Sequence, residues 1–201
     1  MSKDIQYTYY YEDKFTQEDV DERRLYLSAE VDSETVDTIV YHIMRFNRLD
    51  KGIPVKERKA IKLYINSPGG SVVDGFAVID AILNSTTPVY TINLAMSASM
   101  AFLIFIAGHK RYSLAHSEFL MHDGSSGFGF ESTAKLKDRI EFETIQLEHM
   151  TKEFILKHTT IEEDLYDLKY RIEWYMLPPE AKQHGIVDFI VGEDCSMDEI
   201  L

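Results

Sequence analysis

The chain has 201 residues, of which 45% are apolar and 12% aromatic, and this composition predicts one globular domain with a substantial core. Acidic residues (34) outnumber basic residues (21), and the formal net charge of -13 leaves no overall positive field to attract nucleic acid or an anionic membrane. The unbroken apolar run at residues 100–107 is far shorter than the roughly 20 residues that a membrane-spanning helix requires. We therefore expect neither nucleic acid nor a membrane as a partner.

The cysteine content and the first residues indicate the compartment. Cys195 is the single cysteine, so the fold cannot rest on an intrachain disulfide, and a reducing compartment fits. Residues 1–15 are polar and aromatic and lack the apolar core of a secretory signal. These two features predict a cytoplasmic protein.

In chain order, the apolar residues alternate between the two-residue period of a strand and the period of a helix, which predicts an α/β fold. Ser33 is the expected N-cap of the first helix, and Gly108 stands where the C-cap of a buried helix would stand. The expected elements are a strand (residues 25–27), a helix (33–50), a strand (60–66), a helix (71–85), a strand (88–95), a helix (100–108), two strands (111–115 and 117–121, with a turn at His116), a long helix (132–158), a helix followed by coil (161–176), a short helix (178–185) and a last strand (186–192).

The expected long helix carries more apolar surface than one contact face requires. A helix that packs only against its own domain usually needs one apolar stripe. Two lines of apolar residues therefore indicate a contact with another subunit, with coverage on both sides by the same chain as the alternative. The first line consists of Leu136, Ile140, Leu147, Met150 and Phe154, and the second of Phe142, Ile145 and His149.

Two strand-to-helix junctions carry residues that could do chemistry. Ser99 stands between an expected strand and a buried helix, which would expose its hydroxyl beside the Met100 N–H. Residues 65–71, INSPGGS, also follow a strand and open a helix, where glycines let a substrate approach backbone N–H groups that can hold an anion or an oxyanion. An ordinary strand-to-helix turn is the alternative for this segment, and the absence of GK[ST] excludes a P-loop.

A serine hydroxyl becomes a good nucleophile only when a base accepts its proton, so Ser99 needs a histidine within reach. His122 is the favoured base because it ends the apolar strand 119–121 and precedes the flexible segment DGSSG. The other six histidines are expected in packed helices, a helix end or turns: His42, His109, His116, His149, His158 and His184.

The remaining candidates are left open or given little weight by the sequence. Many carboxylates could orient the imidazole, and spacing does not choose among them. Ser97 would share a strand face with Ser99, so spacing does not exclude it as the nucleophile. Cys195 is expected in a loose acidic tail and is a poor candidate for a catalytic thiolate. No group of residues has convincing zinc spacing.

Four segments resemble the proteolytic subunit of Clp protease, in the same order and at similar intervals between residues 24 and 191: LYINSPGGSV, ASMAFLIFIAG, FLMHD and PPEAKQHGIVD. The resemblance implies a crotonase-like (ClpP) fold of repeated ββα units with a protruding strand and helix, the handle, at about residues 124–158. It divides the chain into an N-terminal segment that could form an axial loop (1–23), one peptidase domain (24–192) and an acidic C-terminal tail (193–201).

The resemblance also assigns roles to residues. Ser99 matches the nucleophile and His122 the base, while the N–H groups of Gly70 and Met100 match the oxyanion hole. Glu173 falls where the family has an aspartate, so it is the expected orienting carboxylate, with Asp167 as the fallback. The family usually has a proline two residues after the base, where this chain has Gly124 in HDG, which leaves the shape of the substrate cleft open. Further residues expected to bind substrate are Gly69, Ser71, Gly124 and Ser125.

The function implied by the resemblance is hydrolysis of peptide bonds in unfolded proteins or peptides through an acyl-enzyme. The resemblance also implies an assembly of stacked seven-membered rings (a tetradecamer) that enclose a chamber. A Clp-type AAA+ unfoldase would feed substrates into this chamber and would consume the ATP. The peptidase itself would need no metal, nucleotide or other cofactor. Two alternatives stay open: a catalytically silent ring or scaffold subunit, and a crotonase-type acyl-CoA hydratase or isomerase.

Overall fold

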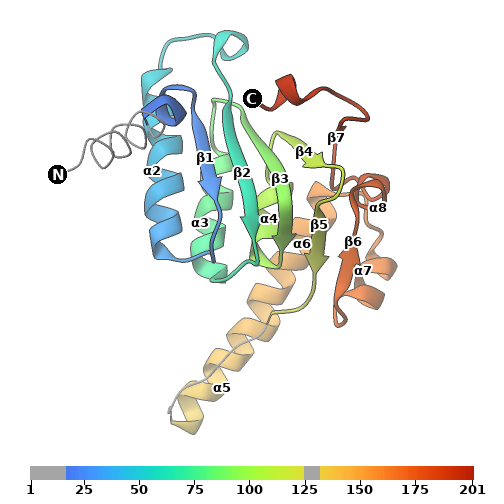
Figure 1. Cartoon of the computed structure of the whole chain (residues 1–201). Helices are drawn as coiled ribbons and strands as arrows, with labels where there is room; N and C mark the ends of the chain where they lie inside the picture. Colours follow the sequence, from blue (N-terminus) through green and yellow to red (C-terminus); the bar gives the residue numbers. More distant parts are fainter. Residues whose placement is uncertain (1–16, 125–131) are drawn as a thin grey trace, which may run out of the picture.

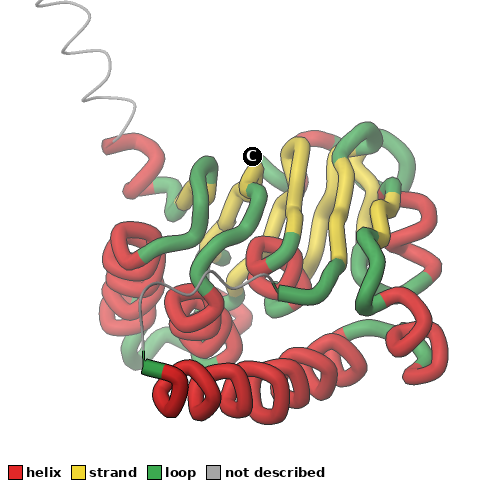
Figure 2. The backbone as a smooth tube through the Cα atoms, turned by 90° about the horizontal axis from the view of Figure 1, so that it is seen from below, coloured by secondary structure: helices red, strands yellow, loops and turns green. Residues whose placement is uncertain are grey.

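The computed structural model describes residues 17–124 and 132–201 and shows one sheet with helices packed against it (Figure 1). Within these residues the sheet has seven strands, and all neighbouring pairs are parallel except β5 with β6. Figure 2 shows most of the helices gathered on one side of the strands. The expected α/β fold is confirmed.

Strands and helices follow one another along the chain in nearly the expected order. The elements are β1 (Arg24–Leu27), α2 (Ser33–Leu49), η1 (Val55–Glu57), β2 (Ile61–Ser67), α3 (Val72–Leu83), β3 (Val89–Ala98), α4 (Met100–Ile106), β4 (Lys110–Leu114), β5 (Glu118–Met121), α5 (Thr133–Glu141), η2 (Phe142–Leu147), α6 (Glu148–His158), α7 (Glu163–Lys169), β6 (Trp174–Met176), α8 (Pro178–Gln183), β7 (Phe189–Val191) and η3 (Met197–Glu199).

Strand β3 is the centre of the sheet. The order of the main path is β1-β2-β3-β4-β7, and β5 joins the last residues of β3. Residues 90–93 pair with β4, whereas residues 96–98 pair with β5. The end of β3, where Ser99 follows, therefore lies between β2 and β5.

Three local predictions were wrong. Asp32, not Ser33, is the N-cap of α2, and its side chain forms a capping box with Thr35. Gly108 has no positive φ, and α4 ends at Ile106 with Ala107 as its C-cap. A Cβ on Gly108 would lie 2.2 Å from the Thr91 Oγ1, so the glycine permits close helix–strand packing. The coil expected before Pro178 contains β6, a three-residue strand too short to produce a clear period.

The core consists of two clusters on the two faces of the sheet. The larger one joins the strands to the helices, and α4 is buried along its whole length. On the other face, the C-terminal residues cover the smaller cluster, which is formed by Tyr64, Ile92, Tyr112, Val191 and Ile200. The tail (residues 193–201) is therefore anchored to the sheet through Ile200 and, in part, Cys195, while its other residues are exposed, and the expectation of a loose tail was wrong.

The long helix is present over residues 133–158 as three consecutive helical segments, α5, η2 and α6, of which η2 is π-helical. Its second half packs on the domain through Phe154 and Ile155, whereas Phe142 (55% exposed) and Ile145 (54%) are not covered by the described chain. Figure 1 shows α5 extending away from the sheet. Within α6, Met150 (39% exposed) and His149 (67%) also remain exposed, so the described chain covers one face of the helix and the alternative of coverage on both sides fails.

The expected N-terminal segment lies mostly outside the described residues. Residues 17–21 are helical, and Asp19 forms an ion pair of 3.1 Å with Arg24 at the start of β1. Among residues 17–124 and 132–201, no helix combines the length and the apolar character needed to cross a membrane.

Candidate active site

Ser99 lies at a strained turn between β3 and α4. Its φ of 54° and ψ of -122° place a non-glycine residue where side chains rarely occur, at a typical cost of about 1–3 kcal/mol. The side chain makes no capping hydrogen bond to α4. Its backbone N–H donates to the Leu120 carbonyl at 2.9 Å, which ties the turn to β5. The turn leaves the Ser99 hydroxyl in a cleft, as the sequence predicted.

The glycine turn, residues 68–70, approaches Ser99 too closely for a side chain. Gly69 has a φ of +93°, and a Cβ built on it would lie 2.6 Å from the Ala98 oxygen, 2.8 Å from the Met100 nitrogen and 2.8 Å from the Ser99 Cβ. Both the positive φ and the contact require glycine. The backbone after β2 therefore forms one wall around Ser99.

The hydrogen bonds around Gly70 determine where its N–H points. The Val31 N–H donates to the Gly69 oxygen (2.9 Å), and the Ser71 N–H donates to the Val31 oxygen (2.8 Å), so Gly70 is bridged in parallel to Val31. Because successive amides alternate in such pairing, the Gly70 N–H points away from Val31, toward β3. Met100, the first residue of α4, also has an N–H with no acceptor within its helix.

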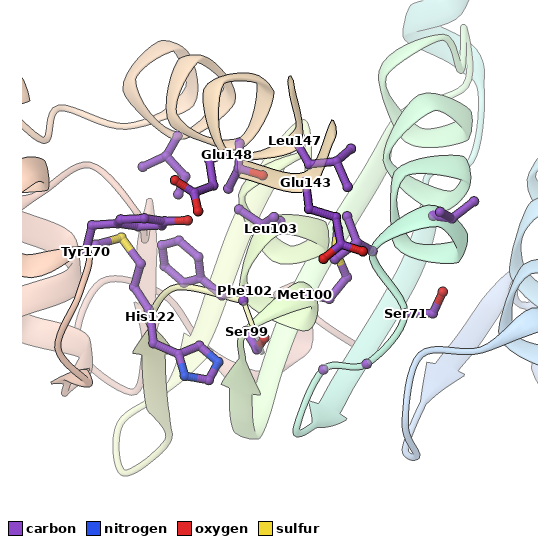
Figure 3. Close-up of a pocket in the computed structure, with 18 of the residues that line it drawn as sticks. Ser71, Ser99, Met100, Phe102, Leu103, His122, Glu143, Leu147, Glu148 and Tyr170 are labelled. Atoms are coloured by element: carbon purple, nitrogen blue, oxygen red, sulfur yellow. The ribbon is translucent and has the colours of Figure 1, made fainter. Parts of the chain in front are cut away.

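His122 directly follows β5 and lines the same cleft as Ser99. The register Ala98↔Leu120 places the ends of β3 and β5 side by side, and Figure 3 shows the imidazole directed to the side on which Ser99 lies. No hydrogen bond joins the Ser99 and His122 side chains in the described part of the chain. Such bonds are often long before substrate binds, so the juxtaposition is compatible with a nucleophile and its base.

The backbone register distinguishes the two carboxylates considered for orienting the imidazole. β5 and β6 are antiparallel with Met121 opposite Trp174, so one further step places His122 opposite Glu173. Glu173 is exposed and accepts a hydrogen bond of 3.0 Å from the Tyr175 hydroxyl, which raises the pKa of Tyr175. The fallback, Asp167, forms an ion pair of 2.7 Å with Lys152. Register favours Glu173, although no hydrogen bond or ion pair joins it to His122 in the described structure.

The cleft around these residues has a volume of about 910 Å³. Its base is the glycine turn, Ser99 and Met100, and its opposite wall is the long helix (Figure 3). Ser71 and Gly124 also line it, but the Ser71 Oγ accepts from the Asp74 N–H at 3.3 Å as the N-cap of α3. Ser125 lies outside the described residues. The cleft is large enough for a peptide segment.

The model of one protein family, Clp protease, matches residues 11–194. The chain belongs to the Clp protease family. It is 29% identical over 174 residues to the ATP-dependent Clp protease proteolytic subunit of Deinococcus radiodurans, an alignment that covers 86% of this chain and 81% of that protein. The predicted resemblance is therefore confirmed, and the family supports a ClpP-type peptidase.

The other candidate nucleophiles of this Clp family member lie away from the cleft. Ser97 is fully buried in β3, and its Oγ has no partner among the described residues. Cys195 is partly buried beside β7, and burial raises the pKa of its thiol, as do Glu199 and Asp194. A raised pKa disfavours the thiolate that a catalytic cysteine needs.

Five of the six remaining histidines have structural contacts, and the sixth, His116, is exposed in the turn before β5. His109 Nδ1 accepts from the Val89 N–H at 3.1 Å, while His42 and His158 contact carbonyls one turn earlier in their helices. His149 lies 3.5 Å from Glu153, and His184 is the C-cap of α8. Among the described residues, no group of three or more His, Cys, Asp or Glu side chains is arranged to hold a metal ion.

Sequence reasoning missed the far wall of the cleft in this Clp family member. Thr144, Glu148, Thr151 and Ile155 are spaced four, three and four residues apart, so they lie on one face of the long helix. Tyr170, just after α7, also lines the cleft. The helical spacing was visible in the sequence, but nothing there indicated which face of the helix would meet Ser99.

Proposed function

We propose that this chain is a serine endopeptidase that hydrolyses peptide bonds of unfolded proteins or peptides through an acyl-enzyme. Ser99 is the nucleophile, His122 the general base and Glu173 the carboxylate that orients the imidazole. One observation carries the proposal: a serine in a strained turn, a glycine turn and a histidine meet in one cleft of a Clp family chain.

The first half of the reaction forms the acyl-enzyme. His122 accepts the Ser99 proton as Oγ attacks the scissile carbonyl carbon, and the Gly70 and Met100 N–H groups donate to the resulting oxyanion. Each donor of this kind lowers the barrier by roughly 3 kcal/mol. His122 then gives the proton to the leaving nitrogen, the C–N bond breaks, and the new N-terminus departs.

The second half releases the acyl group. A water molecule gives a proton to His122 as its oxygen attacks the ester carbonyl, and the same two N–H groups stabilise the second oxyanion. When the C–O bond to Ser99 breaks, His122 returns the proton to Oγ. The products are a carboxylic acid and the original enzyme, so no metal, nucleotide or other cofactor takes part in the peptidase reaction.

The proposal extends to an assembly of stacked heptameric rings served by a Clp-type AAA+ unfoldase in the cytoplasm. The uncovered Phe142 and Ile145 on the long helix support a contact between subunits. Sedimentation velocity tests this contact. Ile145→Asp should reduce the assembled fraction, and Gln146→Asp on the next helical position should not; equal assembly of both variants would contradict the contact.

A catalytically silent ring subunit is the second candidate. It is favoured by the lack of a Ser99–His122 hydrogen bond in the described structure and by the bond between Glu173 and Tyr175. A crotonase-type acyl-CoA enzyme is the third, and the glycine turn is the feature that such an enzyme would share.

Intact-protein mass spectrometry after incubation with a fluorophosphonate separates these candidates. The wild type should form one adduct, Ser99→Ala none, and His122→Ala an adduct at a much lower rate. A folded, assembled wild-type protein without an adduct would contradict the peptidase, and turnover of an enoyl-CoA would then separate the acyl-CoA enzyme from the silent subunit.

A further inference from the structure

The charges that line the cleft are of one sign. Among the described residues around it, carboxylates are contributed by Glu30, Glu143 and Glu148, and no lysine or arginine lines it. Arg139 lies 3.4 Å from Glu143, so that charge is partly compensated. The chain as a whole carries -13. The field in the cleft therefore favours a positively charged ligand group.

Glu148 is the carboxylate that faces the end of the cleft nearest Tyr170. It is half-buried at the start of α6, and no ion pair or hydrogen bond engages it within the described chain. Figure 3 shows its carboxylate directed toward the Tyr170 hydroxyl. The pKa of Tyr170 is raised to about 12, first by burial, then by the charge of Glu148 and then by that of Asp123. Tyr170 is therefore a neutral hydroxyl beside an unpaired carboxylate.

The ring of Tyr166 supports the ring of Tyr170. The two rings stack with centroids 5.1 Å apart and planes at 21°, and the two residues are one helical turn apart. Tyr166 is 2% exposed, its hydroxyl has no hydrogen-bond partner in the described residues, and it is not among the residues that line the cleft. Burial, Tyr170 and Glu148 raise the pKa of Tyr166. Tyr166 therefore holds the Tyr170 ring in place and does not itself meet a ligand.

An ammonium or guanidinium group satisfies Glu148 and Tyr170 at once. It donates to the Glu148 carboxylate and to the Tyr170 hydroxyl oxygen, and the Tyr170 ring can also face a cation. A carboxylate ligand would be repelled, and an apolar ligand would leave the half-buried carboxylate unpaired. The chemistry of the site thus selects a basic side chain.

We propose that Glu148 and the Tyr170 hydroxyl form a subsite that binds a lysine or arginine side chain of a peptide lying across Ser99. The assignment of the ligand as a peptide rests on the proposed peptidase function. The subsite makes Glu148 a specificity-determining residue, and this chain should favour substrates with basic residues near the cleaved bond.

Fluorescence anisotropy on the Ser99→Ala protein tests the subsite without turnover. Two fluorescein-labelled decapeptides serve as probes, one with lysine at alternate positions and the other with norleucine, which keeps the alkyl chain and lacks the ammonium group. The lysine peptide should bind about 10-fold more tightly, the size expected for one charge-assisted hydrogen bond in a half-buried site.

Two variants with the same change in net charge distinguish the subsite from the general field of the protein. Glu148→Gln should reduce the preference to about 2-fold or less, whereas Glu153→Gln, exposed on the same helix, should leave it at about 10-fold. Tyr170→Phe, which removes only the hydroxyl beside Glu148, should reduce the preference as well. Equal affinities of the two peptides, or a preference that Glu148→Gln leaves unchanged, would overturn the subsite.

The fluorophosphonate adduct keeps the two proposals separate. An adduct on the wild type together with equal binding of the two peptides would overturn the subsite and leave the peptidase standing. A lysine preference that depends on Glu148 in a protein without an adduct would support the subsite and overturn the peptidase.

Discussion

The backbone N–H of Ser99 donates a hydrogen bond of 2.9 Å to the carbonyl of Leu120. Leu120 lies in β5, two residues before His122, and is the register partner of Ala98. The turn that holds the candidate nucleophile is therefore bound to the strand that holds the candidate base. Their relative position depends on backbone pairing and not on side-chain contacts alone.

The strain at Ser99 should be measurable as stability. Glycine adopts a φ of 54° readily, whereas alanine keeps the strain, so Ser99→Gly should have a higher free energy of unfolding than Ser99→Ala. Relief of about 1–3 kcal/mol, less the entropy that glycine loses on folding, predicts a difference of about 1 kcal/mol. Urea unfolding of the two inactive variants measures it. A more stable alanine variant would show that the turn stores no strain.

The close contact of Gly69 can be separated from its backbone conformation. Gly52 has the same φ of +93°, and a Cβ there would have no atom within 4 Å. Gly52→Ala should cost about 1 kcal/mol of stability, and Gly69→Ala a further 1–3 kcal/mol, roughly, because the new Cβ displaces the Ser99 turn. Gly69→Ala should also lose the fluorophosphonate adduct. Retention of the adduct by Gly69→Ala would contradict this account.

The orienting carboxylate is tested by a pair of amide substitutions. Glu173→Gln should slow adduct formation about 10-fold or more, up to the roughly 10⁴-fold loss seen when a triad carboxylate becomes an amide. Asp167→Asn breaks an exposed ion pair with Lys152 and should leave the rate unchanged. Rates of adduct formation at equal protein concentration give the comparison. The reverse ranking would transfer the orienting role to Asp167.

The packed C-terminal residues should contribute to stability through one side chain. Ile200 is buried and its backbone oxygen accepts a hydrogen bond from the Tyr64 hydroxyl, whereas Leu201 is 64% exposed. Ile200→Ala should lower the free energy of unfolding by about 2–4 kcal/mol, and Leu201→Ala by less than about 0.5 kcal/mol. Equal, small effects in thermal unfolding would mean that the tail is loose in solution.

A buried ion pair near β1 should make stability depend on acid. The Arg23 guanidinium donates two hydrogen bonds of 2.6 Å to Asp50, and the Thr87 hydroxyl donates one of 2.7 Å. Arg23 first, and Thr87 after it, hold the pKa of Asp50 below its ordinary value of 3.8, against the opposing effect of burial. The stability from these bonds is present above about pH 4 and is lost as pH falls through the lowered pKa.

Asp50→Asn tests that linkage. At neutral pH it should cost about 3 kcal/mol, since one partner of a buried pair is removed, and its difference from wild type should shrink below pH 3.8. Asp37→Asn, an exposed carboxylate on the same helix, controls for the change in net charge. A difference that stays constant between pH 7 and pH 3 would contradict the linkage.

Sequence reasoning was strongest where a local signal has a local cause. The order of strands and helices followed from apolar period, and the turn at Ser99 and the glycines before Ser71 followed from strand-to-helix junctions. His122 was predicted from its place at a strand end, and the structure brings it to the same cleft as Ser99.

The features that were missed depend on tertiary structure. Strand β6 has three residues and exists because β5 offers an edge for pairing. Asp32 displaced Ser33 as the N-cap because the helix begins one residue earlier than predicted and Thr35 completes a capping box with Asp32. The inward direction of Glu148 is set by the way the long helix crosses the sheet.

The candidate site gathers residues from positions far apart in the chain. Gly70 is positioned by Val31, Ser99 is held by β5, and Glu173 precedes the strand that pairs with β5. A ribosome adds these residues in order, so a nascent chain carries Ser99 and His122 before it carries Glu173. The proposed triad therefore cannot assemble until most of the chain has been translated.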